Sequence, residues 1–303
     1  KLNNKALPPK SVMVTCIGSA VGKVALNEKK CITNQQINSI VVNIKKYSSD
    51  YVYYALKNNY KTLRNAATGS TALPLLNKTD FDLIKLKIHK QLSDQQKIAS
   101  VLSPLDAKIE LNNRINAELE AMAKTLYDYW FVQFDFPNEQ GKPYKSSGGK
   151  MVYNKELKRE IPEGWKVTEL GKLIDIQRGI SYKSSEIKSD VGIPMINLNS
   201  FNLNGTYKEA GIKLFSGKYS DKNLVTPGDL LIAATDVTRN ANIIGRAILV
   251  PNYYQSDTTY SMDIAKIIPG NVINSPYLMM LFNSKHYHDY IKWFASGTLV
   301  LHL

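Results

Sequence analysis

Polar side chains that could contact a nucleic acid lie in short segments of the second half of the chain, beside stretches of strand composition. Arginine hydrogen-bonds well to guanine, and asparagine or glutamine to adenine, whereas lysine, serine and threonine suit phosphates. We therefore expect DNA contacts from these loops. The candidates are Arg178, Ser181, Tyr182, Lys183, Asn197, Asn199, Thr235, Asp236, Arg239, Asn240, Asn242, Gln255, Ser256 and Thr258.

The first 80 residues hold a smaller set of the same chemistry, again next to predicted strands. Its members are Ser19, Lys23, Asn34, Gln35, Gln36 and Ser70.

Residue patterns that would support catalysis are weak. The segment from Gly18 to Lys23 has three residues between its glycines where a phosphate-binding loop has four, and Val24 stands where Ser or Thr would bind magnesium. We interpret it as a tight turn between strands, with Lys23 available to contact a phosphate.

His286 and His288 have no further metal ligands at the spacing that a metal site requires. We find no Ser/His/Asp set and no Asn-Pro-Pro-Tyr-type segment. The chain is predicted to bind, with no catalytic residue, metal or cofactor of its own.

Charge points to the partner. The net charge is +13, from 39 Lys and Arg against 26 Asp and Glu, which favours a polyanionic partner such as DNA.

The sequence has no run of 18 apolar residues that would suggest a membrane span, and residues 1–10 contain no apolar segment typical of a signal peptide. The two cysteines, Cys16 and Cys31, form no disulfide framework, so we expect free thiols and a cytoplasmic setting.

The longest helical pattern runs from Ser93 to Phe136. Ser93 and Gln96 form an S-x-x-Q capping box, and apolar residues then recur at steps of three and four from Ile98 to Leu126. Ser103-Pro104 resembles the start of a new helix. We therefore predict a short helix, a restart at Ser103 and a long helix to about Phe131, whose apolar stripe needs a partner.

An internal repeat flanks this helix. Predicted strands at 11–17, 22–26 and 36–42 match 229–235, 245–250 and 260–267, in the same order. The predicted helix at 51–60 matches 276–283, and the loop at 67–70 matches 295–298. Five elements in one order indicate two related modules.

The second copy has a front half from about 161 to 223, with a short helix predicted at 167–174 and strands around 193–198 and 212–215. Residue 1 aligns near residue 219, so roughly 60 residues of the first copy are expected upstream. We predict an α+β protein: 1–90 as the C-terminal half of a first recognition domain, 91–136 as a helical spacer, 137–160 as a polar linker and 161–303 as a second recognition domain.

Three segments resemble the specificity subunit of type I restriction-modification systems. The run from Ser93 to Ile109 looks like that family's spacer helix, and the run from Tyr127 to Pro137 looks like its end. The run from Ile161 to Lys172, followed by Ile176 to Gly179, is similar to the entry into a target-recognition domain.

The resemblance implies two mixed, mostly β recognition domains separated by a long helix that pairs antiparallel with another helix, as in a coiled coil. Each domain would read one half of a split double-stranded DNA target, and the helices would set the gap between the halves. Two methyltransferase subunits carrying S-adenosylmethionine would dock on the helices and methylate adenine. Restriction subunits would add ATP- and magnesium-dependent translocation and cleavage.

Two alternatives remain open at this point. The chain could be a DNA methyltransferase or nuclease with a fused recognition domain, which S-adenosylmethionine binding by this chain would favour. It could instead be a helical scaffold without nucleic acid, which affinity for DNA that is insensitive to salt would favour.

Overall fold

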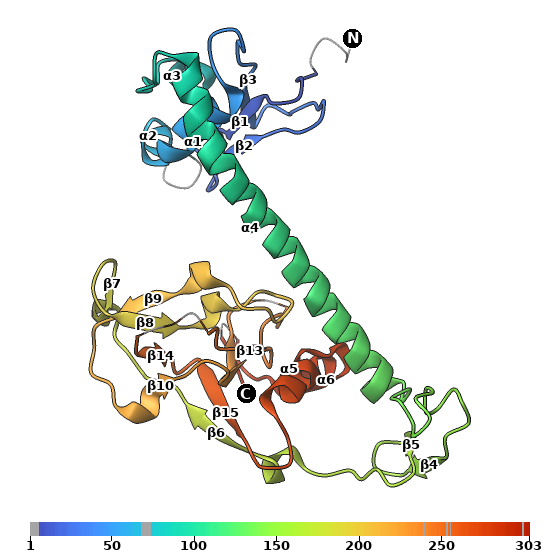
Figure 1. Cartoon of the computed structure of the whole chain (residues 1–303). Coiled ribbons are helices and arrows are strands. Elements are labelled where there is room, and N and C mark those ends of the chain that lie inside the picture. The colour runs from blue at the N-terminus through green and yellow to red at the C-terminus, as the bar shows by residue number, and fades with distance from the viewer. Residues whose placement is uncertain (1–5, 68–73, 239, 253, 255, 299) are drawn as a thin grey trace. The chain divides into compact units, whose positions relative to one another are not determined.

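The computed structural model describes residues 6–67, 74–238, 240–252, 254, 256–298 and 300–303. The chain is an α+β protein that divides into two compact units, residues 1–121 and 122–303. Each unit contains antiparallel strands and short helices, and the long helix α4 lies between the two sheet-rich parts in sequence (Figure 1).

The first unit is built on a three-stranded antiparallel sheet in the order β2-β1-β3. Alternation along β1 (Val12–Thr15) buries Val12 and Val14, which pack with Leu56, Leu63 and Leu76 from the segments that cover the sheet. The other elements are β2 (Val24–Leu26), β3 (Ile37–Ile40), α1 (Ser49–Asn58), α2 (Tyr60–Asn65) and α3 (Lys78–Asp82).

Helix α4 (Leu92–Tyr127) is continuous, and Pro104 lies inside it, so the predicted restart at Ser103 is wrong. The Ser103 hydroxyl does not cap a new helix but donates to the carbonyl of Ala99, one turn earlier. The predicted capping box is wrong as well, because the helix begins before Ser93. Gln95 anchors this end instead: its Oε1 accepts from the Ser48 N–H at 3.0 Å and its Nε2 donates to the His89 carbonyl at 2.7 Å.

The segment after α4 is folded. A π-helical turn, η2 (Asp128–Val132), extends α4 to about the predicted end, and a hairpin of β4 (Met151–Asn154) and β5 (Arg159–Pro162) follows. Phe136 stacks between Tyr144 and Trp165, with ring centroids 4.8 and 5.5 Å away. The residues that we predicted as a polar linker therefore contain ordered turns held by aromatic contacts.

The second unit contains two larger sheets. One has four strands in the order β13-β11-β15-β6, and the other has five in the order β10-β14-β8-β9-β7. The strands are β6 (Ile174–Arg178), β7 (Ile187–Lys188), β8 (Ile193–Ile196), β9 (Lys213–Phe215), β10 (Leu224–Val225), β11 (Leu230–Ala233), β12 (Thr235–Asp236), β13 (Ala247–Leu249), β14 (Thr258–Tyr260), β15 (Ile264–Pro269) and β16 (Leu301–His302).

Two expectations for this unit are corrected. The helix predicted at 167–174 is only a 3-10 turn, η3 (Leu170–Lys172), before β6. The single strand predicted at 260–267 is split between β14 and β15, which belong to different sheets. The helices of the unit are α5 (Ser275–Asn283) and α6 (Lys285–Ile291), and its other 3-10 turns are η4 (Ser184–Glu186), η5 (Leu198–Ser200), η6 (Glu209–Gly211), η7 (Asp221–Asn223) and η8 (Lys292–Phe294).

The internal repeat is confirmed by topology. Strand β1 lies between β2 and β3 as β11 lies between β13 and β15, and all four pairings are antiparallel. The Leu76 N–H donates to the Cys16 carbonyl at 2.8 Å, and in the second unit the Leu303 N–H donates to the Ala234 carbonyl at 3.0 Å. The two modules therefore share a backbone framework despite their different side chains.

The helix pairs repeat too. The N-cap side chains of α1 and α5, Ser48 and Asn274, accept from the N–H groups of Tyr51 and Tyr277, three residues later. Gly22 and Gly245 both have positive φ, and a Cβ at either would press on the second helix of its own pair. A glycine at this turn thus lets the chain pass close to that helix in each module.

Candidate nucleic-acid interface

Antiparallel pairing brings the predicted contact loops together at one end of the strands in each sheet. We call this end of the strands, with its polar loops, the polar edge. The end of a central strand meets the beginnings of its two antiparallel neighbours, so the loops before and after them are adjacent. In the first unit this edge carries Ser19 and Lys23 between β1 and β2, and Asn34 to Gln36 just before β3. In the second unit it carries the loop 237–242 and Arg178, whose partner at the start of β15 is Ala265.

The turn between β1 and β2 has the predicted form. Gly18 and Gly22 adopt φ of 81° and 87°, and the Val21 N–H donates to the Gly18 carbonyl at 3.1 Å. The side chains of Ser19 and Lys23 are exposed, while the Ser19 carbonyl accepts from Arg64 Nη1 at 3.1 Å. The turn presents a hydroxyl and an ammonium group to solvent from a fixed backbone.

The corresponding loop of the second unit is organised by Asp236. This carboxylate is fully buried and accepts from the N–H groups of Thr238, Ile243 and Ile244 at 2.6, 2.6 and 2.9 Å. Within the loop, the Thr238 hydroxyl accepts from the Asn242 N–H at 2.9 Å. Three backbone donors thus converge on one side chain, which fixes the positions of Thr238, Ile243 and Ile244 relative to one another.

Four residues predicted to contact DNA face the interior instead. Asp236 holds the loop, Thr235 donates to the Asp263 carboxylate at 3.1 Å, and Thr258 donates to the Ser256 carbonyl at 3.1 Å. The amide of Asn197 is buried and donates to the carbonyls of Met195 and Gly211. A polar residue after a strand satisfies buried backbone groups as readily as it meets a ligand. We leave these four out of the contact surface.

The remaining candidates divide by exposure. Arg178 is exposed at the edge, and its Nη2 also donates to the Leu303 carbonyl at 3.1 Å. Tyr182 and Asn242 are half-buried. The other exposed candidates are Asn34, Gln35, Gln36, Ser181, Lys183, Asn199, Asn240 and Ser256. Ser70, Arg239 and Gln255 lie outside the described residues.

Sequence reasoning missed one cation at this surface. The Lys213 ammonium group lies over the Tyr182 ring, 5.8 Å from its centroid, and the same ring contacts Phe215 edge-on. Lys213 and Phe215 are two apart on β9, so the alternation of the strand puts both on the face next to Tyr182. This alternation along β9 was the sequence signal from which Lys213 could have been predicted.

The histidines have different surroundings. His286 is exposed, whereas His288 is buried, and its Nε2 has no hydrogen-bond partner in the described structure. Burial, followed by the nearby Arg246 and Lys292 cations, lowers the pKa of His288 to about 4. Among the described residues, no three His, Cys, Asp or Glu side chains are grouped as a metal site would require.

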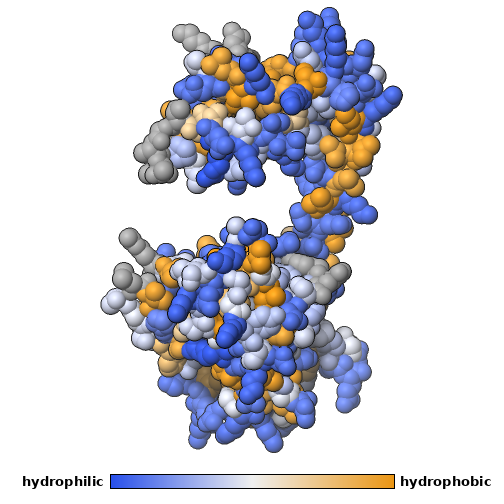
Figure 2. Space-filling model, turned by 90° about the vertical axis from the view of Figure 1, so that its left-hand side faces the viewer, coloured by the Kyte–Doolittle hydropathy of each residue, from blue (hydrophilic) through white to orange (hydrophobic). Residues whose placement is uncertain are grey.

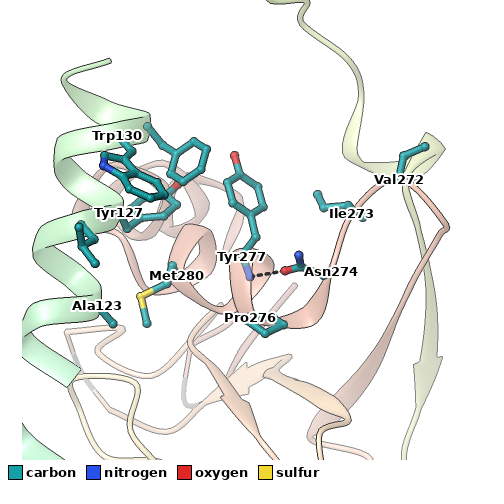
Figure 3. Close-up of a pocket in the computed structure, with 11 residues that line it drawn as sticks. Ala123, Tyr127, Trp130, Val272, Ile273, Asn274, Pro276, Tyr277 and Met280 are labelled. Atoms are coloured by element: carbon teal, nitrogen blue, oxygen red, sulfur yellow. Dashed lines mark hydrogen bonds between the residues drawn. The ribbon is translucent and has the colours of Figure 1, made fainter. Parts of the chain in front are cut away.

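An apolar cavity belongs to the second unit (Figure 3). It measures about 540 Å³ and lies between the last turns of α4 and the start of α5. Tyr127, Trp130 and Tyr277 line it, and the dashed bond in Figure 3 joins the Tyr277 N–H to the Asn274 side chain at 2.9 Å. Burial raises the pKa of Tyr127, whose ring contacts Tyr277. The cavity suits an apolar occupant rather than nucleic acid.

A repeated sheet-and-helix module with a polar edge and an intervening long helix is the organisation of a DNA specificity protein. The family model described as the type I restriction modification DNA specificity domain matches residues 1–121 and 162–301. These ranges cover most of the chain, and the chain belongs to this family.

Three curated proteins that resemble the chain are specificity subunits of type I restriction enzymes. The specificity subunit of the type I restriction enzyme MjaIX from Methanocaldococcus jannaschii is 32% identical over 182 residues, which cover 59% of this chain and 39% of the relative. The MjaVIII specificity subunit of the same organism is 24% identical over 311 residues, covering 98% of this chain and 67% of the relative. The HindI specificity subunit of Haemophilus influenzae is 56% identical over a short stretch of 41 residues, 14% of this chain and 9% of the relative.

Solved structures include the S subunit of a type I restriction-modification system from M. genitalium. It shares 15% identity with this chain at a TM-score of 0.47, over 95% of this chain and 67% of that one. Among the curated relatives, the matched part of the chain spans about two fifths of the MjaIX subunit and about two thirds of the MjaVIII subunit.

Proposed function

We propose that this chain provides DNA sequence specificity to a type I restriction-modification complex. The observation that carries the proposal is the repeat: one chain of this family holds two copies of the same sheet and helix pair, each with a polar edge. Two related readers in one chain suit a target in two parts. The net charge of +13 suits a DNA partner.

We assign the domains from the correspondence between the modules. Residues 1–90 are assigned to the first recognition domain, 91–136 to the spacer, 137–160 to the linker and 161–303 to the second recognition domain. The shared strand orders β2-β1-β3 and β13-β11-β15 support a recognition domain on each side of the spacer in the sequence.

The spacer is our proposed docking surface for methyltransferase subunits. Apolar side chains gather along α4 (Figure 2), and Val101, Leu105, Ile109 and Leu119 are each more than half exposed. A stripe of this kind is normally covered, since an isolated amphipathic helix is marginal in water. An antiparallel partner helix and two methyltransferase subunits would bury it.

Catalysis is assigned to those partners. S-adenosylmethionine and adenine methylation would belong to the methyltransferase subunits, and ATP, magnesium and cleavage to restriction subunits. No helix of the described residues is long and apolar enough to cross a membrane. Because the proposed substrate is chromosomal DNA, we place the complex in the cytoplasm.

The test is base-resolution mapping of adenine methylation in cells that carry this subunit and its methyltransferase partner. We expect a motif in two parts separated by a gap of constant length. A continuous motif, or no motif, would contradict the proposal. S-adenosylmethionine binding by this chain alone would favour a fused enzyme, and DNA affinity unchanged between low and high salt would favour a scaffold.

A further inference from the structure

Three aromatic side chains project into solvent where α6 runs into the turn η8. Trp293 is 87% exposed, and Tyr290 and Phe294 are both more than half exposed. The rings of Tyr290 and Phe294 contact each other, with centroids 4.9 Å apart. Single exposed aromatic residues are common, but a contiguous group of them often marks a contact site. We call Lys292–Phe294, together with Tyr290, the aromatic turn.

The aromatic turn is an addition to the second module. Ala67 follows the N-cap of α2, Asn59, by eight residues, whereas the matching Ala295 follows the N-cap of α6, Ser284, by eleven. The three additional residues correspond in number to η8. Both modules therefore keep the same framework around this point, and the second module carries aromatic residues for which the first has no space in its sequence.

Hydrogen bonds connect the aromatic turn to the polar edge of the second unit. Ser296 and His302 exchange both backbone hydrogen bonds, at 3.1 and 2.8 Å. His302 is also paired with Thr235 in the two-stranded β12–β16 sheet, directly before the loop that Asp236 organises. Trp293 is therefore three residues from a backbone bridge to the predicted contact surface.

The charges around the aromatic turn favour an anionic partner. Within residues 284–298 the sequence has one acidic residue, Asp289, and it is bonded to Lys285. Lys292 adjoins Trp293 and has no acidic residue within two positions on either side in sequence. Aromatic rings beside a cation are the combination that stacks on bases or meets thymine methyl groups while the cation approaches phosphate.

We propose that the aromatic turn is a DNA-contacting wedge that contributes to reading only the half-site bound by the second module. The inference rests on the proposed function and adds a specificity determinant to it. Both modules share the same backbone pairing, and an element present in only one of them can give its half-site a different base preference. The apolar faces of Trp293 and Phe294 would pack on a base step or on base edges.

Accessibility of Trp293 provides a direct test in the assembled complex. Acrylamide quenching of tryptophan fluorescence is measured for the wild-type and Trp293→Phe complexes, with and without duplex DNA containing the target, and the difference isolates Trp293. We expect DNA to reduce the quenching of Trp293 several-fold. If the wild-type complex binds the duplex and Trp293 stays fully quenchable, the wedge is refuted while the proposed function stands. If the wild-type complex fails to bind DNA, the proposed function itself fails.

Methylation mapping tests the specificity. We expect Trp293→Ala to weaken methylation about ten-fold and to relax base preference in one half of the motif, leaving the other half unchanged. Tyr153→Ala is the matched control, because Tyr153 is an exposed aromatic residue on the β4–β5 hairpin. An unchanged motif, or equal loss in both halves at wild-type thermal stability, overturns the proposal. Loss of methyltransferase subunits from the Trp293→Ala complex would show that the turn binds protein instead.

Discussion

At the scale of single residues, Asp236 shows how a buried charge can shape a recognition loop. Its buried carboxylate accepts hydrogen bonds from three backbone N–H groups, those of Thr238, Ile243 and Ile244, in place of water. Removal of the carboxylate would leave these donors unpaired in the interior. In the proposed function, Asp236 would therefore act through the loop and not by contact with DNA.

We predict that Asp236→Ala lowers the free energy of unfolding of the second unit by roughly 2–4 kcal/mol, because several buried donors lose their acceptor. Asp175→Asn, at an exposed position on β6, is the control and should change it by less than about 0.5 kcal/mol. Urea denaturation with an unchanged m-value measures both. Equal effects from the two variants would mean that the Asp236 network contributes little.

His288 occupies a position that the first module fills with a leucine. Counted from the N-caps of α2 and α6, His288 corresponds to Leu63, and both are buried. An imidazole there must stay neutral, which is why its pKa falls to about 4. In the unfolded chain the pKa returns to about 6.5, so the unfolded state takes up a proton first as pH falls.

This linkage predicts the sign of a pH effect. The stability due to neutral His288 is fully present above about pH 6.5 and is lost as pH falls towards 4, by on the order of 3 kcal/mol. His288→Leu should abolish that part of the slope of unfolding free energy against pH. His286→Leu, an exposed site on the same helix, serves as the control. A wild-type slope in the His288→Leu variant would contradict the assignment.

At the scale of elements, α4 tolerates a proline in its interior. Pro104 cannot donate to the Ser100 carbonyl, and its ring crowds that turn. Other contacts offset this loss of helix stability. Gln95 anchors the first turn of the helix, and Lys57 contacts Asp106 at 3.4 Å. Tertiary contacts thus override a sequence signal that favoured a new helix start.

Replacement of this proline should stabilise the helix. Pro104→Ala restores a backbone hydrogen bond, and we expect roughly 1–3 kcal/mol more stability of the first unit by thermal or urea unfolding. Ser103→Ala, which removes only the hydroxyl bond to Ala99, should move stability by less than about 1 kcal/mol. If Pro104→Ala destabilises, the proline fits a local geometry that alanine cannot keep.

The strand repeat could be predicted from sequence because β-branched runs and their order are local signals. The turns of residues 134–150 could not, since their stability comes from Phe136, Tyr144 and Trp165, which meet only after folding. The same limit applies to the interface. Composition suggested candidate loops, but the burial of Asp236 and Asn197 could not be predicted from it because burial depends on the folded structure.

The close packing of Gly149 against Tyr144 in these turns leads to a further prediction. A Cβ on Gly149 would lie 2.5 Å from the Tyr144 ring and 2.6 Å from the Tyr144 carbonyl oxygen. We expect Gly149→Ala to open the segment and to speed limited proteolysis within residues 138–160. At Gly171 an added Cβ meets nothing within 4 Å, so Gly171→Ala should be cleaved at the wild-type rate. Equal rates for both variants would show that the segment adapts to the added methyl group.

At the scale of the whole molecule, two kinds of contact should be separable. If the chain binds DNA as proposed, its net charge of +13 would supply much of the affinity through counterion release, and this part would carry no sequence information. Contacts to base edges add specificity with little dependence on salt. Lys23 and Asn240 are both exposed. From their chemistry we propose that Lys23 makes a contact of the first kind and Asn240 one of the second.

We therefore predict opposite effects for two variants of the assembled complex. Lys23→Ala should reduce the slope of log affinity against log salt by about one, with the methylated motif unchanged. Asn240→Ala should keep the slope and alter base preference in one half-site. Lys155→Ala, at an exposed lysine beyond β4, is the control for loss of charge alone. If Lys155→Ala reduces the slope as much as Lys23→Ala does, net charge and not the sheet edge determines affinity. If Asn240→Ala changes the slope and leaves the motif intact, its loop binds phosphates and base reading lies elsewhere on the module.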